Sequence, residues 1–302
     1  MRKFIIRTFA FVAMATAMMA LLDIAITYQA QHSDLRPYWK WNHAIRSGND
    51  ADIYIMGNSR AWCHFSPAIL DSAFDANTMN FGLDGAGFDW QLANYNLYRN
   101  NNPKPKLLIM TIDYSEFSIT AGYERHQFFH LFLSPELRDS VFPVHHFSWA
   151  ERYLPMYRYA NYGLDKYFDK KPYTLYKGYA GQDRHWGEFD NTTSTNPRYA
   201  ANGQIMEKME RHLAKASSEG INMVFVHAPT YSRYYPTIKN LDSMWTIVHQ
   251  WSEKYDIPII DYTSDPICDD TSCFYNPRHL NKKGAERISR QLANDIKELN
   301  LL

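Results

Sequence analysis

The residues best suited to nucleophilic chemistry are a serine near the start of the chain and a histidine near its end. Ser59 lies in the stretch GNSR (57–60), directly after the apolar run 53–56, and His279 precedes the last helical stretch. A serine hydroxyl becomes a good nucleophile once a base takes its proton, and imidazole titrates near neutral pH. His227 is the rival base because it also follows an apolar run, but the surroundings of His279 favour His279. Such a pair predicts attack on an acyl ester.

A second requirement of this chemistry is a group that binds the developing oxyanion. The backbone N–H groups of Ser59 and Gly82 are candidates, and loss of one such donor typically costs about 10²–10³ in rate. Gly82 lies in NFGLDGAG (80–87), where glycines would let the backbone approach an acyl group closely. The alternative reading is that these glycines only form a strand-to-helix turn.

Five short apolar runs must position these residues. They occupy 51–57, 78–82, 104–113, 221–229 and 257–262, and amphipathic helical stretches separate them. One such stretch begins at 66–67, with Ser66 as the expected N-cap. Apolar strands that alternate with amphipathic helices predict an α/β fold with a parallel five-stranded sheet covered on both faces. Ligands of such sheets bind at the carboxyl ends of the strands, where Ser59 lies.

Three motifs in this order resemble the SGNH, or GDSL-type, hydrolase superfamily, and more narrowly its membrane-anchored cell-envelope branch of esterases and O-acyltransferases. They are GNSR, NFGLDGAG and NPRHLNKKGA (276–285). The resemblance implies a flavodoxin-like three-layer α/β/α sandwich. It also implies that Ser59 is the nucleophile, that Gly82 helps to form the oxyanion hole and that His279 is the base.

Two departures from the family pattern concern the same site. Asn276 stands where the family usually has an aspartate; an amide can orient the imidazole but cannot offset the imidazolium charge. The site would then be a Ser–His dyad, or a carboxylate such as Asp261, Asp269 or Asp270 would replace the aspartate, or activity has been lost. The family's third block, Gly-x-Asn-Asp, is also missing, because the third apolar run ends in TIDYSEF (111–117).

Four polar residues near these motifs are candidates for substrate binding: Arg60, Asp113, Tyr114 and His227. Arg60 could bind a substrate anion, although pairing with a carboxylate on a neighbouring loop is the favoured reading. Asp113 could orient Arg60 or a sugar hydroxyl, or it could only cap the following turn. The pattern of Asp113 and Tyr114 is similar to that of the acyltransferase-like branch.

The N-terminus indicates export. Arg2, Lys3 and Arg7 precede a stretch without charges, and no convincing cleavage site follows. We therefore expect residues 1–28 to form an uncleaved signal anchor in the inner membrane, followed by a linker at 29–50 and an extracytoplasmic, periplasmic domain at 51–302. A cleaved signal peptide is the alternative, and both readings export the domain.

Composition limits the partners. The 32 basic and 32 acidic residues balance, and we expect no nucleic-acid partner. The three cysteines have no zinc-like spacing with histidines, so we expect no metal site and no cofactor. Cys268 and Cys273 could form a disulfide in an exported chain, or all three cysteines could be reduced.

Residues 118–200 interrupt the strand–helix pattern and are dense in Tyr, Phe, Trp and His. We expect a lid-like insertion, whose aromatic residues could stack on sugars, lie at a membrane interface or simply form a core. The sequence thus predicts an exported serine esterase or O-acyltransferase that acts on acyl esters, such as acetyl esters, of an envelope glycan. An acyl-donor membrane protein is an expected partner of a transferase. The alternative is a catalytically degenerate protein of the same fold that binds polysaccharide or serves in an envelope assembly complex.

Overall fold

The computed structural model describes residues 1–119, 129–132, 134–160, 176–187 and 197–302. The chain forms two compact units. One consists of Met1–Asn42 and Glu124–Pro172, and the other of His43–Tyr123 and Tyr173–Leu302. The candidate site lies entirely in the second unit.

The second unit is built on a parallel five-stranded sheet, as the sequence predicts. Its strands are β1 (Ile53–Met56), β2 (Thr78–Asn80), β3 (Leu107–Thr111), β4 (Asn222–His227) and β5 (Ile259–Asp261), in the order β2-β1-β3-β4-β5. This order is that of the flavodoxin-like doubly wound fold, which the resemblance implied. β1 is an interior strand between β2 and β3, and all four of its residues are buried because both faces of the sheet are covered.

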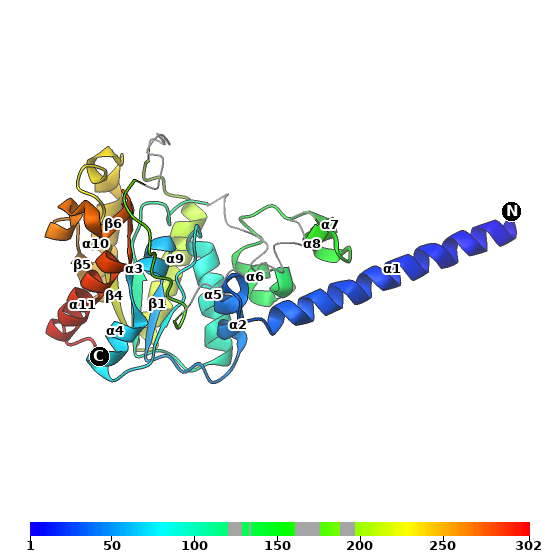
Figure 1. The fold of residues 1–302 in the computed structure, drawn as a ribbon, viewed down its shortest axis with the longest axis horizontal. Coiled ribbons are helices and arrows are strands. Elements are labelled where there is room, and N and C mark those ends of the chain that lie inside the picture. Colours follow the sequence, from blue (N-terminus) through cyan, green and yellow to red (C-terminus); the bar gives the residue numbers. More distant parts are fainter. Residues whose placement is uncertain (120–128, 133, 161–175, 188–196) are drawn as a thin grey trace. The chain divides into compact units, whose positions relative to one another are not determined.

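Helices cover both faces of the sheet (Figure 1). On one face α11 (Lys282–Glu298) packs against α3 (Ser59–His64) and α4 (Pro67–Phe74). On the other face α9 (Gly203–Ser218) packs against α5 (Phe88–Asn101) and α10 (Leu241–Tyr255). The fold class is therefore confirmed as a three-layer α/β/α sandwich.

α11 shows why the sequence folds this way. Ile288, Leu292 and Ile296 recur at helical spacing and are fully buried in the core cluster. Asn281 caps the helix, since its side chain accepts a hydrogen bond from the Gly284 N–H. The last helix consequently holds the segment that precedes it, which includes His279, against the sheet.

Two local features differ from the prediction. α3 begins at Ser59 itself and α4 follows it; Ser66 is the N-cap residue of α4, but its side chain makes no capping hydrogen bond. An antiparallel hairpin of β6 (Phe274–Asn276) and β7 (His279–Leu280) precedes α11, and the sequence pattern did not reveal it. The short 3-10 helices of this unit are η4 (Tyr235–Thr237), η5 (Pro266–Asp269) and η6 (Thr271–Cys273).

The first unit is helical. It contains α1 (Arg2–Gln31), most of α2 (Arg36–Ile45), η2 (Phe129–Leu131), α6 (Pro135–Ser140), α7 (Trp149–Tyr153) and α8 (Tyr157–Ala160). Asn42 joins three of these elements: its Nδ2 donates to the carbonyls of Ala30 and Ser33, both at 2.7 Å, and its Oδ1 lies 2.9 Å from Nε2 of His130. α1 is long and apolar enough to cross a membrane, and a signal sequence would have the same character.

The predicted insertion, 118–200, is divided between the two units. Residues 129–132 and 134–160 belong to the unit that contains α1, whereas 176–187 belong to the unit of the sheet. Much of the remainder lies outside the described residues, and the lid-like role of the insertion stays a prediction. All three cysteines are buried and free, so Cys268 and Cys273 do not form the disulfide considered above.

Candidate active site

The turn after β1 presents Ser59 at the carboxyl end of this interior strand. Gly57 has a φ of +155°, and a Cβ at this position would lie 1.8 Å from Oγ1 of Thr111, so the turn needs glycine. Asn58 caps α3, because its side chain accepts from the Arg60 N–H at 2.9 Å. Ser59 is the first residue of α3, where a backbone N–H has no acceptor within the helix.

Ser59 and His279 meet although 220 positions separate them in the sequence. The Oγ of Ser59 lies 2.8 Å from Nε2 of His279, and Nδ1 of His279 lies 3.0 Å from Oδ1 of Asn276. That same Oδ1 accepts the backbone N–H groups of Arg278 and His279, each at 2.9 Å. Because this oxygen can only accept, Nδ1 carries the proton and Nε2 is free to accept the serine hydroxyl.

The hairpin explains this alignment. Asn276 ends β6 and His279 begins β7, so the turn between them places both side chains on one line with Ser59. The ring of Tyr275 stacks on His279 with centroids 5.4 Å apart, and the Leu280 N–H donates to Nε2 of His64. Packing on these sides fixes the orientation of the imidazole.

None of the three substitute carboxylates contacts His279 through a hydrogen bond or ion pair among the described residues. Asp261 lies 3.3 Å from Nδ1 of His227, and Asp270 accepts from Ser272 and Cys273. His227 is buried, and its ring faces Tyr235 and Trp245 in addition to Asp261; within the described residues it makes no hydrogen bond to Ser59. The arrangement is a Ser–His pair oriented by an amide, with His279 and not His227 beside the serine.

The protonation state of His279 suits a base. Burial, followed by the positive charges of Arg278 and Arg60, lowers its pKa from 6.5 to about 3, although Asp113 opposes the shift. The imidazole is therefore neutral at neutral pH and can take a proton. The same charges disfavour the imidazolium that must form during the reaction.

Arg60 and Asp113 form a buried network below the site. Nη1 of Arg60 donates to Asp113 at 2.9 Å, and its Nη2 donates to the carbonyls of Ala228 and Pro229 and to Thr230. Arg278 reaches the other oxygen of Asp113 at 3.5 Å. The Arg60 and Asp113 side chains are only 3% and 1% exposed, which supports the pairing reading of Arg60.

The predicted substrate-binding residues thus divide into two groups. Arg60, Asp113 and His227 are buried and bonded to the protein, so the structure does not present them to a substrate. Tyr114 is partly exposed, and the guanidinium of Arg278 lies 5.0 Å from the centre of its ring. Arg278, which the sequence reasoning passed over, is the more accessible cation at this site, with its side chain 30% exposed.

Two buried residues position the turns, and the sequence reasoning missed both. Glu116 accepts the backbone N–H groups of Asn58 and Asp113 and the side chain of Gln91, and burial raises its pKa well above the usual value. Asn80 donates to two carbonyls near the ends of α3, Ala61 and Phe65. Asn80 is the last residue of β2 and Glu116 lies five residues after the end of β3, and no sequence pattern marked either role.

Gly82 has a structural reason to be glycine. A Cβ there would lie 2.4 Å from the backbone nitrogen of Trp62, so glycine lets the turn after β2 pack on α3. Its N–H donates to Oδ1 of Asn80 at 3.0 Å. The N–H of Gly82, a predicted oxyanion donor, is therefore already hydrogen-bonded within the protein. The N–H of Ser59, the other predicted donor, lies beside the Ser59 hydroxyl.

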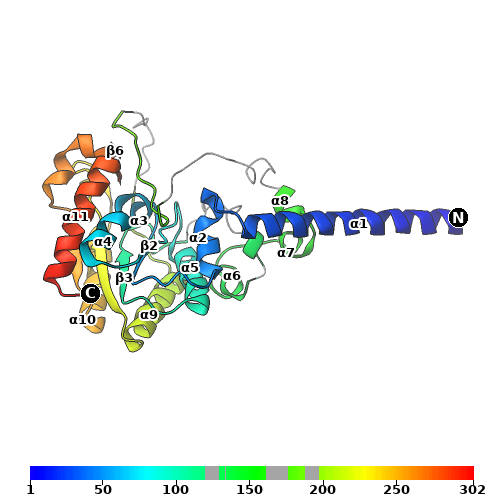
Figure 2. The same ribbon diagram turned by 60° about the horizontal axis from the view of Figure 1, so that its bottom comes forward.

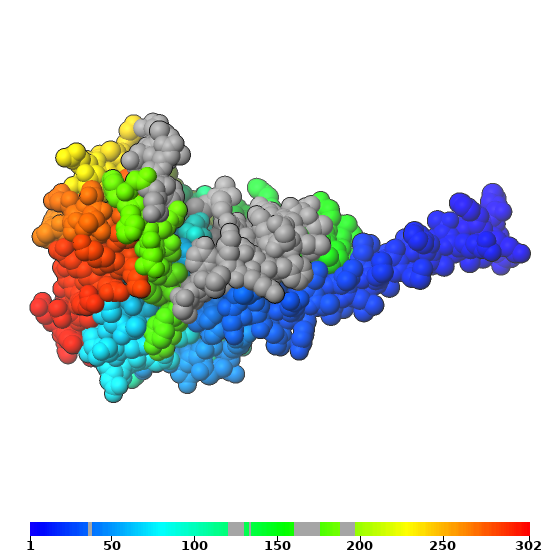
Figure 3. Space-filling view, viewed as in Figure 1, coloured from blue at the N-terminus to red at the C-terminus, as the bar shows by residue number. Residues whose placement is uncertain are grey.

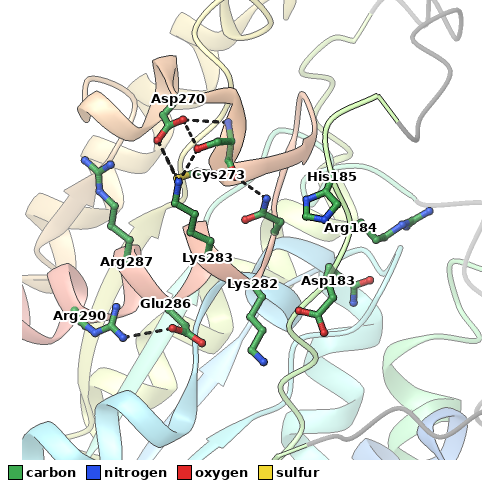
Figure 4. Close-up of a pocket in the computed structure, with 13 residues that line it drawn as sticks. Asp183, Arg184, His185, Asp270, Cys273, Lys282, Lys283, Glu286, Arg287 and Arg290 are labelled. Carbon is green, nitrogen blue, oxygen red and sulfur yellow. Dashed lines mark hydrogen bonds and ion pairs between the residues drawn. The ribbon is translucent and has the colours of Figure 1, made fainter.

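A polar cleft lies next to the hairpin (Figure 4). The cleft has a volume of about 730 Å³. One of its lining residues, Arg184, leads to the site, because the guanidinium of Arg184 lies over the ring of Tyr275, and this ring stacks on His279. Most of its lining is charged: Asp183, Arg184, Asp270, Lys282, Lys283, Glu286, Arg287 and Arg290. Backbone hydrogen bonds join the segment 176–187 to the rest of this unit: one to Trp62, one from Lys282 and one from Asn80. Within the described part of the chain, no cluster of three or more His, Cys, Asp or Glu residues could hold a metal ion.

A search of solved structures finds matches to this chain at low sequence identity. One is a chain from Desulfitobacterium hafniense DCB-2 named as a lipolytic protein of the G-D-S-L family, at 10% identity and a TM-score of 0.40. That match covers 80% of this chain and 97% of the other.

Two further matches are a chain from Bacteroides fragilis NCTC 9343 named as an acylhydrolase and a chain from Streptococcus pneumonia named as a platelet activating factor. Both are 11% identical; the TM-scores are 0.44 and 0.43, and the coverage of this chain is 87% and 97%. They are covered over 94% and 99% of their own lengths. No family model and no curated protein matches the chain.

Proposed function

We propose that this SGNH-like chain is a serine esterase or O-acyltransferase that acts on acyl esters of a cell-envelope glycan, acetyl esters being the simplest case. The observation that carries the proposal is the line of three side chains: Ser59, the neutral imidazole of His279 and the oxygen of Asn276. A serine within hydrogen-bond reach of an oriented base is the arrangement that nucleophilic catalysis requires.

In the proposed reaction Ser59 Oγ attacks the ester carbonyl while its proton passes to Nε2 of His279. The tetrahedral intermediate collapses to an acyl-serine, and the alcohol leaves with the proton that His279 returns. Water then completes an esterase cycle, whereas a sugar hydroxyl completes a transferase cycle. The Ser59 N–H would stabilise the oxyanion, and Gly82 would join it only if its N–H turned away from Asn80.

Two observations support a glycan rather than a lipid as the substrate. The cleft beside the hairpin is lined mostly by charged side chains, which match a polar chain and not an aliphatic one. Tyr114, beside Arg278, offers a partly exposed aromatic ring of the kind that stacks on sugars. A transferase would also need a source of acyl groups, and a membrane protein that delivers them is the partner we propose for that case.

For the location we propose an inner-membrane protein with α1 retained as a single span and the enzyme domain on the periplasmic side. The end of α1 is part of a folded unit, because Ala30 is buried and its carbonyl accepts from Asn42. Removal of a signal peptide within or after this segment would take away packed residues. Protease added to spheroplasts should digest the domain, and protection of the domain would contradict this orientation.

Ester hydrolysis by the purified full-length protein tests the proposed function. We expect release of acetate from an acetylated glycan or an activated acetyl ester, and Ser59→Ala should lower the rate at least about 10³-fold. Ser72→Ala is the matched control, since Ser72 is an exposed serine on α4 and its variant should retain full activity. Equal rates for Ser59→Ala and wild type would contradict the proposal.

The second candidate is a binding protein that has lost catalysis. Two features favour it: Asn276 replaces a carboxylate, and Asp113 with its arginines fills the place of the missing third block. Absence of turnover together with unchanged glycan binding by Ser59→Ala would favour this candidate.

A further inference from the structure

We propose that α7 and α8 form an interfacial membrane surface, in which aromatic side chains lie among the lipid headgroups beside the point where α1 leaves the bilayer. The inference rests on the proposed retention of α1 as a membrane span. It concerns the unit of α1 alone and requires no enzymatic activity.

The surface consists of four large side chains that remain substantially exposed. Trp149, Tyr153, Leu154 and Tyr157 are 66%, 62%, 40% and 39% exposed, and we call them the interfacial patch. The rings of Trp149 and Tyr153 lie 5.9 Å apart. Tryptophan and tyrosine concentrate at membrane interfaces because one end of each side chain is apolar and the other can bond to water.

Contacts with α1 fix the position of this patch. Arg158 pairs with Asp23 at 2.5 Å, and the Met156 N–H donates to the same carboxylate at 2.8 Å. The hydroxyl of Tyr159 lies 2.5 Å from that of Thr27. Both charged side chains are mostly buried, at 9% and 13% exposure, so the pair joins α8 firmly to the C-terminal part of α1.

The position along α1 corresponds to the edge of a bilayer. Residues 4–22 would cover about 28 Å at 1.5 Å per residue, close to the thickness of the hydrocarbon core. Arg7 can extend its side chain toward the cytoplasmic headgroups. Asp23, the first acidic residue of α1, then lies where the helix leaves the hydrocarbon, and α7 and α8 lie at that level in both ribbon views (Figures 1 and 2).

Continuity with α1 favours a bilayer as the occupant. The N-terminal part of α1 extends beyond the other described helices of its own unit (Figure 3), and its exposed apolar side chains continue through Leu22 and Ile24 to Tyr28. The interfacial patch extends this apolar surface sideways from the helix. Leu154 adds an aliphatic group, which would gain from lipid contact but offers no flat face to a sugar.

Depth-dependent quenching in liposomes tests the proposal with the full-length protein. A fluorophore on Trp149→Cys would report on the patch, one on Met14→Cys on the span, and one on Asp139→Cys on an exposed position of α6 in the same unit. The three native cysteines are buried, so labelling should occur at the introduced thiols.

We expect nitroxide lipids labelled near the headgroup to quench the probe at 149 at least about twofold more than the probe at 139. Lipids labelled deep in the acyl chain should quench the probe at 14 most strongly. If the probe at 149 behaves like that at 139 while the probe at 14 is deep, the patch is not interfacial and the proposal is overturned. If the probe at 14 is also in water, α1 is not a span and the proposal fails with it. Neither result bears on the esterase reaction.

Discussion

Replacement of Asn276 by aspartate is the most informative single change at the site. The carboxylate would keep all three hydrogen bonds of the amide oxygen, because that oxygen only accepts, from Nδ1 of His279 and from two backbone N–H groups. The variant would therefore add a negative charge 3.0 Å from the imidazole with little change in geometry.

The size of the effect follows from that distance. Two unit charges about 3 Å apart interact by about 3–5 kcal/mol at an effective dielectric constant of about 20–40. Desolvation of the new carboxylate would offset roughly half of this, which leaves a rise of about 1–2 units in the pKa of His279. Starting from a pKa of about 3, the variant should titrate between about pH 4 and 5. The same energy stabilises the imidazolium of the transition state, so the rate at pH 7 should rise about 10–100-fold.

The second-order rate of labelling by a fluorophosphonate, measured from pH 4 to 8, gives both quantities without knowledge of the substrate. Wild type should show little loss of rate down to pH 4, because its base is still neutral there. Asn276→Asp should react faster at pH 7 and lose rate below about pH 5. Asp261→Asn is the control, since that carboxylate pairs with His227 and should leave the profile unchanged. A slower Asn276→Asp variant with an unshifted profile would refute this reasoning.

Three further predictions concern the scaffold. Gly82→Ala places a Cβ 2.4 Å from a backbone nitrogen of α3. It should lower the free energy of unfolding, measured in urea, by about 1–3 kcal/mol and should also lower the rate of fluorophosphonate labelling. A variant as stable as wild type would contradict the close packing. Asp113→Asn leaves the buried guanidinium of Arg60 and the partly exposed one of Arg278 facing an amide. It should cost about 3–5 kcal/mol by the same assay, whereas a loss under 1 kcal/mol would show that the Arg60–Asp113 pair is dispensable. Stability should also fall as the pH drops below about 6.5, because histidines that stay neutral in the folded chain become protonated in the unfolded chain. Calorimetry should show that the melting temperature decreases by more than about 5 °C from pH 7 to pH 5. A constant melting temperature would contradict the lowered pKa values. The histidines with lowered pKa are His64, His130, His212, His227 and His279.

Much of the sheet could be predicted because its signals are local. An apolar run such as 53–56, followed by a glycine turn, specifies a buried strand and its end without knowledge of the rest of the chain. The pairing of Ser59 with His279 was predicted from the motifs that resemble SGNH hydrolases. Strand geometry alone did not identify the base, because His227 ends the parallel strand β4 whereas His279 lies in the later hairpin.

The features that the sequence did not reveal depend on distant segments. The pairing of Arg60 with Asp113 was among the interpretations of the sequence, but the carbonyl acceptors of Arg60 after β4 were not predicted, because no spacing rule connects these positions. The hairpin of β6 and β7 is too short for a periodic signal. The pairing of Asp23 with Arg158 likewise joins α1 to a segment 135 residues later, although an acidic residue in an apolar helix was a hint that a partner exists.

Mass spectrometry of the fluorophosphonate-treated protein tests the central claim most directly, because only a serine activated by a base reacts readily. We predict one adduct per chain, located on Ser59, and its loss in both Ser59→Ala and His279→Ala. Ser59→Ala should melt at the wild-type temperature, since Asn58 and not Ser59 caps α3, so the loss could not be attributed to unfolding. Folded wild-type protein that forms no adduct, or an adduct that persists in Ser59→Ala, would contradict the assignment of Ser59 as the nucleophile.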